Sequence, residues 1–297
     1  MAEKIRFDDS DDLIDICMDN VFKAVFTKDI PASQTALSRL VSAIIGRDVE
    51  IITIVANEPA IENLRDRQIR FDINCRARDG EMVNVEMSLN PDPFEPVRLE
   101  FHAEKLFTGQ DIRGSKKTYD DLRRTYQIAI LVREQFFSDG DFFHNFEYYD
   151  PARRVSLDGR TRILTLELSK LETVAKKPAA EMSVRELWAI YFRYLKDSGM
   201  RAKINEILER EEGIAMASEV LLTISRDEAE RARLMSEYKY QLDMQSKLVH
   251  AERQGYKDGE QKGEQKGEQK IIDLLKSGKS PEEIIREYDG KPKPKNT

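Results

Sequence analysis

Two acidic residues take matching positions on a predicted β-hairpin. Residues 67–78 (RQIRFDINCRAR) and 81–89 (EMVNVEMSL) alternate apolar and polar side chains, and Asp79-Gly80 between them is a strong hairpin signal. Successive strand residues point to opposite faces, so each segment has an apolar face and a polar one. Asp72 lies in the polar row of the first segment and Glu86 in the polar row of the second.

The register of this hairpin decides whether the two carboxylates meet. A two-residue loop would pair Asp72 with Met87 and so set a polar face against an apolar one, whereas both apolar faces must contact the same core. We therefore expect a loop of three or five residues, or a bulge, which places Asp72 opposite Glu86 or Ser88.

Two neighbouring carboxylates suggest a metal site. Like charges held close together resist joint ionisation unless a cation neutralises them. Mg²⁺ takes a few carboxylate oxygens together with waters and substrate phosphate. The residues alone leave a second interpretation equally open, in which this is a solvated sheet face with incidental carboxylates.

The elements around the hairpin follow an α-α-β-β-β-α-β-β-β order. Periodicity predicts the helices, with Ser33 and Gly46 as caps of the second, and β-branched or apolar runs predict the strands. The helices are expected at 18–28, 33–46 and 97–109, and the other strands at 50–56, 125–133 and 161–168, with an aromatic segment at 142–150.

Beyond residue 170 the patterns are helical. A capping box of Ser183 and Glu186 opens a helix over 182–195, and helical patterning continues over 201–212 and 214–253. Glycines recur every four residues in DGEQKGEQKGEQK (258–270), and each costs about 0.8–1 kcal/mol in a helix, which favours a solvated linker unless something packs on it. Two short helices should follow, the second capped by Ser280 and Glu283.

These patterns divide the chain into three parts and exclude several classes of protein. We expect an α/β domain over 1–175, a helical extension over 176–255, and a repeat tail with a helical hairpin over 256–297. No apolar run reaches 18 residues, and no glycine-rich phosphate loop is present, so neither a membrane span nor a nucleotide cofactor is expected. Two cysteines and an acidic N-terminus suggest a cytoplasmic protein.

Charge and histidine usage limit the possible partners. Forty-eight basic and 55 acidic residues give a formal net charge of −7, which argues against sequence-independent coating of nucleic acid but leaves room for a local basic groove. Basic residues cluster at 65–78 and 113–124, where a solvated face is the simpler interpretation. The three histidines are scattered, and each is expected to be a structural residue.

The order of elements and motifs resembles the PD-(D/E)XK nuclease superfamily, and more narrowly its transposase-like branch, the recombination-promoting nuclease family. The resemblance spans nearly the whole chain. It rests on DNVFKAVF (19–26), RFDINCRARDGEMVNVEMSL (70–89), Arg98, Gln110, Tyr119, LELSKL (166–171), Trp188 and the glycine-repeat tail.

The resemblance implies a restriction-endonuclease-like core, a small mixed sheet flanked by helices, that hydrolyses DNA in recombination or mobile elements. Asp72, Glu86 and the main-chain carbonyl of Met87 would bind Mg²⁺ or Mn²⁺, and Asp19 would add a metal or water contact. The candidate DNA-binding residues are Arg76, Arg98, Gln110, Arg113, Lys116 and Lys117.

One position departs from the family pattern. The third motif residue, usually Lys and often Gln in this branch, is Ser88, which is too short and neutral to orient the nucleophile or offset phosphate charge. Arg76 lies on the same polar face and would be a substitute charge, although Arg cannot act as a base. The alternative function is therefore a weak or inactive nuclease fold that serves as an interaction scaffold and oligomerises through its tail.

Overall fold

The computed structural model describes residues 5–8, 10–55, 72–91, 93–112, 117–133, 135–157 and 159–289. The chain divides into two compact units, Met1–Tyr238 and Lys239–Thr297. The boundaries expected at residues 175 and 255 stay predictions.

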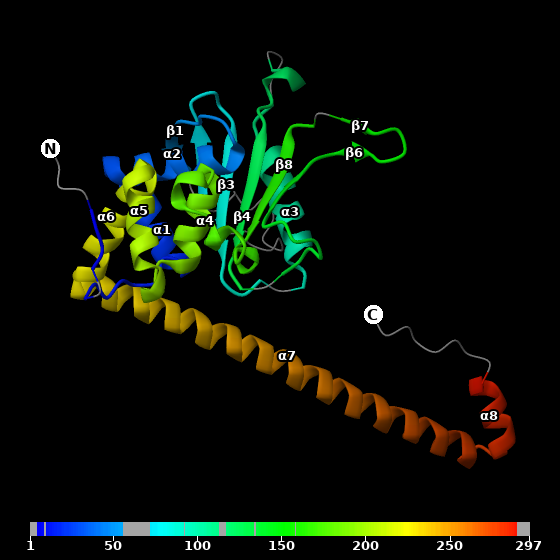
Figure 1. Ribbon diagram of the computed structural model, residues 1–297. Coiled ribbons are helices and arrows are strands. Elements are labelled where there is room, and N and C mark those ends of the chain that lie inside the picture. The colour runs from blue at the N-terminus through cyan, green and yellow to red at the C-terminus, as the bar shows by residue number, and fades with distance from the viewer. Residues whose placement is uncertain are drawn as a thin grey trace. The chain divides into compact units, whose positions relative to one another are not determined.

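The first unit is built on a six-stranded mixed sheet (Figure 1). Its spatial order is β1-β2-β3-β4-β8-β5, in which β3, β4 and β8 are parallel and the other neighbours are antiparallel. The carboxyl ends of the three parallel strands therefore meet at one edge. The strands are β1 (Ile51–Ile54), β2 (Ile73–Ala77), β3 (Met82–Ser88), β4 (Thr125–Leu131), β5 (Phe143–Phe146) and β8 (Thr161–Glu167), and a separate hairpin pairs β6 (Tyr149–Asp150) with β7 (Val155–Ser156).

The β2–β3 hairpin has the register expected from its two faces. Ile73 pairs with Val85, which sets Asp72 opposite Glu86, and the Ala77 N–H donates to the Glu81 carbonyl across a three-residue loop. The loop closes at Gly80, whose φ of +86° lies in the left-handed region that favours glycine. The three-residue loop is thus confirmed, while the expected strand residues 67–71 lie outside the described part of the chain.

Helices cover both faces of the sheet. One face is packed by α1 (Asp19–Thr27) and α2 (Pro31–Ile45), and the other by α3 (Glu95–Thr108), which contacts β3, β4 and β8 (Figure 1). Each helix follows from apolar residues at helical spacing, as in α1, whose buried stripe is Val21, Phe22, Val25 and Phe26.

Ser33 is not the cap of α2, contrary to the prediction. The helix begins at Pro31, because proline fits the first turn of a helix, and Gly46 ends it in a left-handed conformation as expected. The buried Ser33 hydroxyl instead donates to the Val25 carbonyl at 2.7 Å, which ties α2 to α1.

Three further helices pack in the same core as α1 and α2. They are α4 (Val184–Tyr194), which starts at the predicted Ser183–Glu186 capping box, α5 (Arg201–Arg210) and α6 (Glu212–Arg226). Trp188 of α4 is fully buried with its ring 6.0 Å from that of Phe26. Short 3₁₀ turns complete the unit at Tyr119–Asp121, Leu168–Lys170, Val174–Lys176, Ala179–Glu181 and Ser198–Met200.

The glycine repeat is helical rather than a linker. Helix α7 (Glu228–Lys276) starts in the first unit, where Leu234 is buried, and continues through the repeat. Side-chain hydrogen bonds from Gln254 to Asp258 and from Gln269 to Asp273 each span one helical turn, one at each end of the repeat. In the second unit α8 (Pro281–Asp289) follows, with the predicted Ser280–Glu283 capping box.

The polar face of the hairpin is buried, not solvated. Asn84 and Glu86 of β3 are 0% and 2% exposed, because α3 lies over this face. The interpretation as a solvated sheet face is therefore wrong for β3. Among the described helices, none combines the length and the apolar character needed to cross a membrane.

Candidate functional site

Asp72 and Glu86 lie side by side at the carboxyl end of β3. Asp72 immediately precedes β2, and its Oδ2 accepts a hydrogen bond from the Met87 N–H at 3.1 Å. The N–H and C=O groups of one strand residue point toward the same neighbour. The Met87 carbonyl therefore faces the Asp72 side of β3, where a ligand held by both carboxylates would lie.

Glu86 is held by partners on β3 and α3. Its Oε1 lies 2.5 Å from His102 Nδ1 of α3 and accepts from Asn84 Nδ2 at 2.9 Å. Asn84 Nδ2 also donates to Gln127 Oε1 of β4 at 2.9 Å. Glu86 Oε2 lies 3.5 Å from Arg98 Nη2 and has no hydrogen-bond partner within the described part of the chain. One carboxylate oxygen is thus fixed, and the other is buried and open to a further ligand.

Helix α1 adds a cation and a third carboxylate. Lys23 Nζ lies 3.1 Å from Asp72 Oδ1 and 3.2 Å from Asp19 Oδ1. Asp19 and Lys23 are one helical turn apart and so share a face. The structure therefore places Asp19 near the pair through Lys23, and its predicted contact with a metal or water stays a prediction.

The surroundings shift the two central carboxyl groups in opposite directions. Burial, with the negative charges of Asp19 and Glu86, raises the pKa of Asp72 to about 7 against the opposing charge of Lys23. Burial alone would raise the pKa of Glu86, but the hydrogen bond and charge of His102, with Arg98 and Asn84, outweigh it and lower that pKa. Burial likewise opposes the charge of Lys23, yet Asp72 and Asp19 raise its pKa. The site thus holds an ionised Glu86, a cationic Lys23 and a carboxyl that protonates near neutral pH.

The donor set suits a hard divalent cation that keeps most of its waters. The described residues contain no group of three or more His, Cys, Asp or Glu side chains placed to hold a metal. Mg²⁺ is commonly bound by only one or two carboxylates, with waters and substrate phosphate filling the other positions. The pairing of Asp72 with Glu86, whose buried Oε2 accepts no hydrogen bond from a described residue, fits such a cation.

The third motif position and its expected substitute lie apart. Ser88 follows Glu86 on the same face of β3 and is partly exposed. Arg76 is exposed and pairs with Met82, four residues along β2 from Asp72, which is about 13 Å at ~3.3 Å per strand residue. The structure does not bring Arg76 to the carboxylate pair.

The candidate DNA-binding residues are dispersed. Arg98 joins the site, because its guanidinium contacts Glu95 at 2.5 Å as well as approaching Glu86. Gln110 is occupied at both ends of its amide by the backbone of Arg123, at 2.8 Å each. Lys117 pairs with Asp111 at 2.8 Å. The two remaining candidates, Arg113 and Lys116, lie outside the described residues.

Sequence reasoning missed Lys23, His102, Asn84 and Gln127. Lys23 could have been found, because it lies four residues after Asp19 within the motif DNVFKAVF. His102 could also have been found, since it stands one turn after Arg98 on the same face of a predicted helix. It was instead expected to be a purely structural residue. Gln127 gave no signal, because nothing in the sequence pairs β4 with β3.

A family model described as a PD-(D/E)XK nuclease family transposase matches residues 16–251, which include every described site residue named above. No curated protein and no solved structure matches the chain.

The raised pKa of Asp72 predicts a pH-dependent gain in stability for Asp72→Asn. An acid whose pKa lies near 7 in the folded state and at its usual 3.8 in the unfolded state destabilises the fold as pH rises between these values. Without divalent metal, Asp72→Asn should therefore raise the free energy of unfolding by an amount that grows from pH 4 to 7 and then stays constant. Urea unfolding in EDTA across this range measures it.

The exposed Asp48 offers a matched control for this series. Asp48→Asn should leave the free energy of unfolding nearly unchanged at each pH. A gain for Asp72→Asn that does not vary with pH would contradict the assignment.

Proposed function

The chain belongs to the PD-(D/E)XK nuclease family transposases, and we propose that it is a Mg²⁺- or Mn²⁺-dependent endonuclease that hydrolyses DNA phosphodiester bonds. The observation that carries the proposal is the pairing of Asp72 and Glu86 at the carboxyl end of β3, where one buried oxygen of Glu86 accepts no hydrogen bond from any described residue. The cellular setting we propose is DNA recombination or the movement of mobile elements, in the cytoplasm.

Asp72, Glu86 and the Met87 carbonyl are the residues that would hold the metal. When bound, a divalent cation lowers the pKa of a coordinated water and stabilises charge on the scissile phosphate. The protein must keep both carboxylates in place and ionised. His102 and Asn84 do this for Glu86, since their contacts hold Oε1 and lower the pKa of the group. Asp19 would add a contact to a metal-bound water through its position beside Lys23.

Lys23 is the residue we propose in place of the missing motif lysine. Ser88 offers no charge, whereas Lys23 Nζ lies 3.1 Å from Asp72 and its pKa is raised, so it stays cationic. A fixed ammonium group at this place can offset phosphate charge and help orient the attacking water. The charge that the motif usually places on the strand would thus come from α1.

Phosphate contacts from α3 and the following loop would position the DNA. Arg98 stands beside Glu86 with 43% of its side chain exposed, which lets it reach a bound phosphate. Lys117, Arg113 and Lys116 would extend these contacts along the loop, with Arg76 further along the sheet. Contacts of this kind set orientation without reading sequence. Gln110 would act by holding the loop, because the Arg123 backbone occupies its amide.

A second candidate function is an interaction scaffold, favoured by Ser88 and by the second unit. Within the described part of that unit, Ile271, Ile272, Leu275 and Ile285 are exposed apolar residues. At four glycines of α7, an added Cβ would meet no atom of the described residues within 4 Å beyond the helix's own nearby backbone, so the helix presents a face that another helix can approach closely. We propose that the tail self-associates, whether or not the first unit is catalytic.

Nicking of supercoiled plasmid tests the nuclease directly. The protein should nick DNA in Mg²⁺ or Mn²⁺ and not in EDTA, and Asp72→Ala or Glu86→Ala should lower the rate by about 10²–10³-fold or more. Asp48→Ala, an exposed aspartate, is the matched control. Absence of nicking, or equal rates in all variants, would favour the scaffold.

Substitution of Lys23 tests the relocated charge. Lys23→Gln should lower the nicking rate by about 10²-fold, whereas Ser88→Ala should change it little. Lys28→Gln is the control, since Lys28 ends the same helix but pairs with Glu230. Adding Ser88→Lys to the Lys23→Gln variant should restore part of the rate. Full activity of Lys23→Gln alone would show that Lys23 is not required.

Light scattering tests self-association of the tail. The full chain should have a larger mass than a variant that ends at residue 254, because the truncation removes the glycine face and the exposed apolar residues. The molar masses of the two proteins are measured at equal concentration, and each is divided by its own chain mass to give the oligomeric state. Monomers for both proteins would refute self-association.

A further inference from the structure

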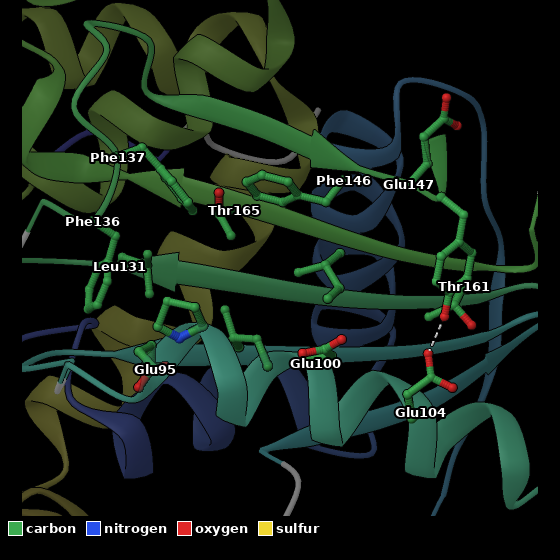
Figure 2. A pocket seen from close by; sticks show the side chains of 14 residues that line it. Glu95, Glu100, Glu104, Leu131, Phe136, Phe137, Phe146, Glu147, Thr161 and Thr165 are labelled. Atoms are coloured by element: carbon green, nitrogen blue, oxygen red, sulfur yellow. Dashed lines mark hydrogen bonds between the residues drawn. The ribbon is translucent and has the colours of Figure 1, made fainter. Parts of the chain in front are cut away.

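A pocket lies on the other side of α3 from the hairpin end, between this helix and strands β4, β5 and β8 (Figure 2). It encloses about 290 Å³, and its walls are mostly apolar. Aromatic rings of Phe136, Phe137, Phe146 and Tyr148 form much of the lining. A pocket of this size and character can exclude water from a small ligand.

The charged residues among the described lining of the pocket are all glutamates. Four glutamates line it, and none of the described lining residues is a lysine, arginine or histidine. Glu95 is neutralised by Arg98 at 2.5 Å, and Glu147 by Arg162 at 2.9 Å.

Two negative charges remain, those of Glu100 and Glu104. Glu104 accepts a hydrogen bond from the Tyr148 hydroxyl at 2.6 Å, drawn as a dashed line in Figure 2. That hydrogen bond, together with burial and the charges of both glutamates, raises the pKa of Tyr148 to about 12. Glu100 has no ion pair among the described residues.

A buried hydroxyl in the pocket wall lacks a partner. Thr165 of β8 is 1% exposed, and its Oγ1 has no hydrogen-bond partner within the described part of the chain (Figure 2). Buried polar atoms are nearly always paired, so this hydroxyl can accept a hydrogen bond from a bound ligand. A ligand with N–H groups would donate the hydrogen bond that this hydroxyl lacks among the described residues.

The spacing of these groups defines the ligand. Glu100 and Glu104 are one turn of α3 apart, about 6 Å along the axis, and Figure 2 shows the glutamates following the helix beneath the aromatic side chains. The ligand must therefore carry at least two positive charges separated by an apolar stretch. Ammonium groups also bind favourably to aromatic faces. We propose that this pocket binds an aliphatic polyamine.

Other ligand classes fit the pocket less well. Phosphorylated ligands would be repelled by Glu100 and Glu104. A hydrated metal ion would lose its waters against apolar walls, and an uncharged apolar ligand would bury carboxylates without a partner. The proposal does not depend on the nuclease activity, because no residue that we place on the metal lines the pocket.

Isothermal titration of the full chain with spermidine tests the proposal. In EDTA and 150 mM salt, one equivalent should bind saturably, whereas 1,8-octanediol should not bind. Glu100→Gln and Thr165→Val should each weaken the affinity by about tenfold or more. Glu100 is exposed and Thr165→Val conserves shape, so both variants should fold, which circular dichroism checks.

The control is Glu219→Gln, which alters an exposed glutamate on α6 and should leave the affinity unchanged. Polyamines also bind acidic proteins loosely through their charge alone. Equal affinity in the wild type, Glu100→Gln and Thr165→Val, or full displacement by Mg²⁺ at matched ionic strength, would mean surface binding of that kind and would overturn the proposal.

Discussion

Two carboxylates held side by side in a buried place must be offset by positive charge or hydrogen bonds. This constraint acts on Asp72 and Glu86, and the surrounding residues follow from it. His102, Asn84 and Arg98 outweigh the effect of burial on Glu86, so its pKa falls. Burial and the charges of Asp19 and Glu86 outweigh the effect of Lys23 on Asp72, so its pKa rises. Because the two pKa values move in opposite directions, Asp72 is the group that a bound cation would stabilise most in its ionised form.

The two faces of the sheet contribute to the site in different ways. Helix α1 brings Lys23 and Asp19 to the Asp72 end of the pair, and α3 brings His102 and Arg98 to Glu86. The large core around Trp188 fixes α1, because α4, α5 and α6 pack in the same cluster. The helices that follow the sheet therefore affect the site indirectly, because their packing fixes the position of α1, which carries Lys23.

Helix α3 separates two environments with different chemistry. Toward β3 it supplies His102 and Arg98 to the carboxylate pair. Toward β8 it lines an acidic, aromatic pocket that suits an organic cation. Arg98 and Glu95 form the contact between the two, because Arg98 lies 2.5 Å from Glu95 of the pocket and 3.5 Å from Glu86 of the site. The positive charge of Arg98 thus partly offsets the negative charge of the pocket's glutamates at Glu86.

The sequence by itself determined the hairpin, the faces of its two strands and the order of the main elements. Alternation, the Asp79-Gly80 turn and the need for one apolar face are local properties, and they limited the partner of Asp72 to Glu86 or Ser88. The three-residue loop of the structure then selects Glu86. Capping boxes likewise marked the starts of α4 and α8. Only the tertiary structure decided that the polar face is buried, that Lys23 and His102 complete the site, and that Arg76 and Gln110 lie elsewhere. A sequence specifies which face of each element is apolar, but which elements meet depends on how all the faces are buried together.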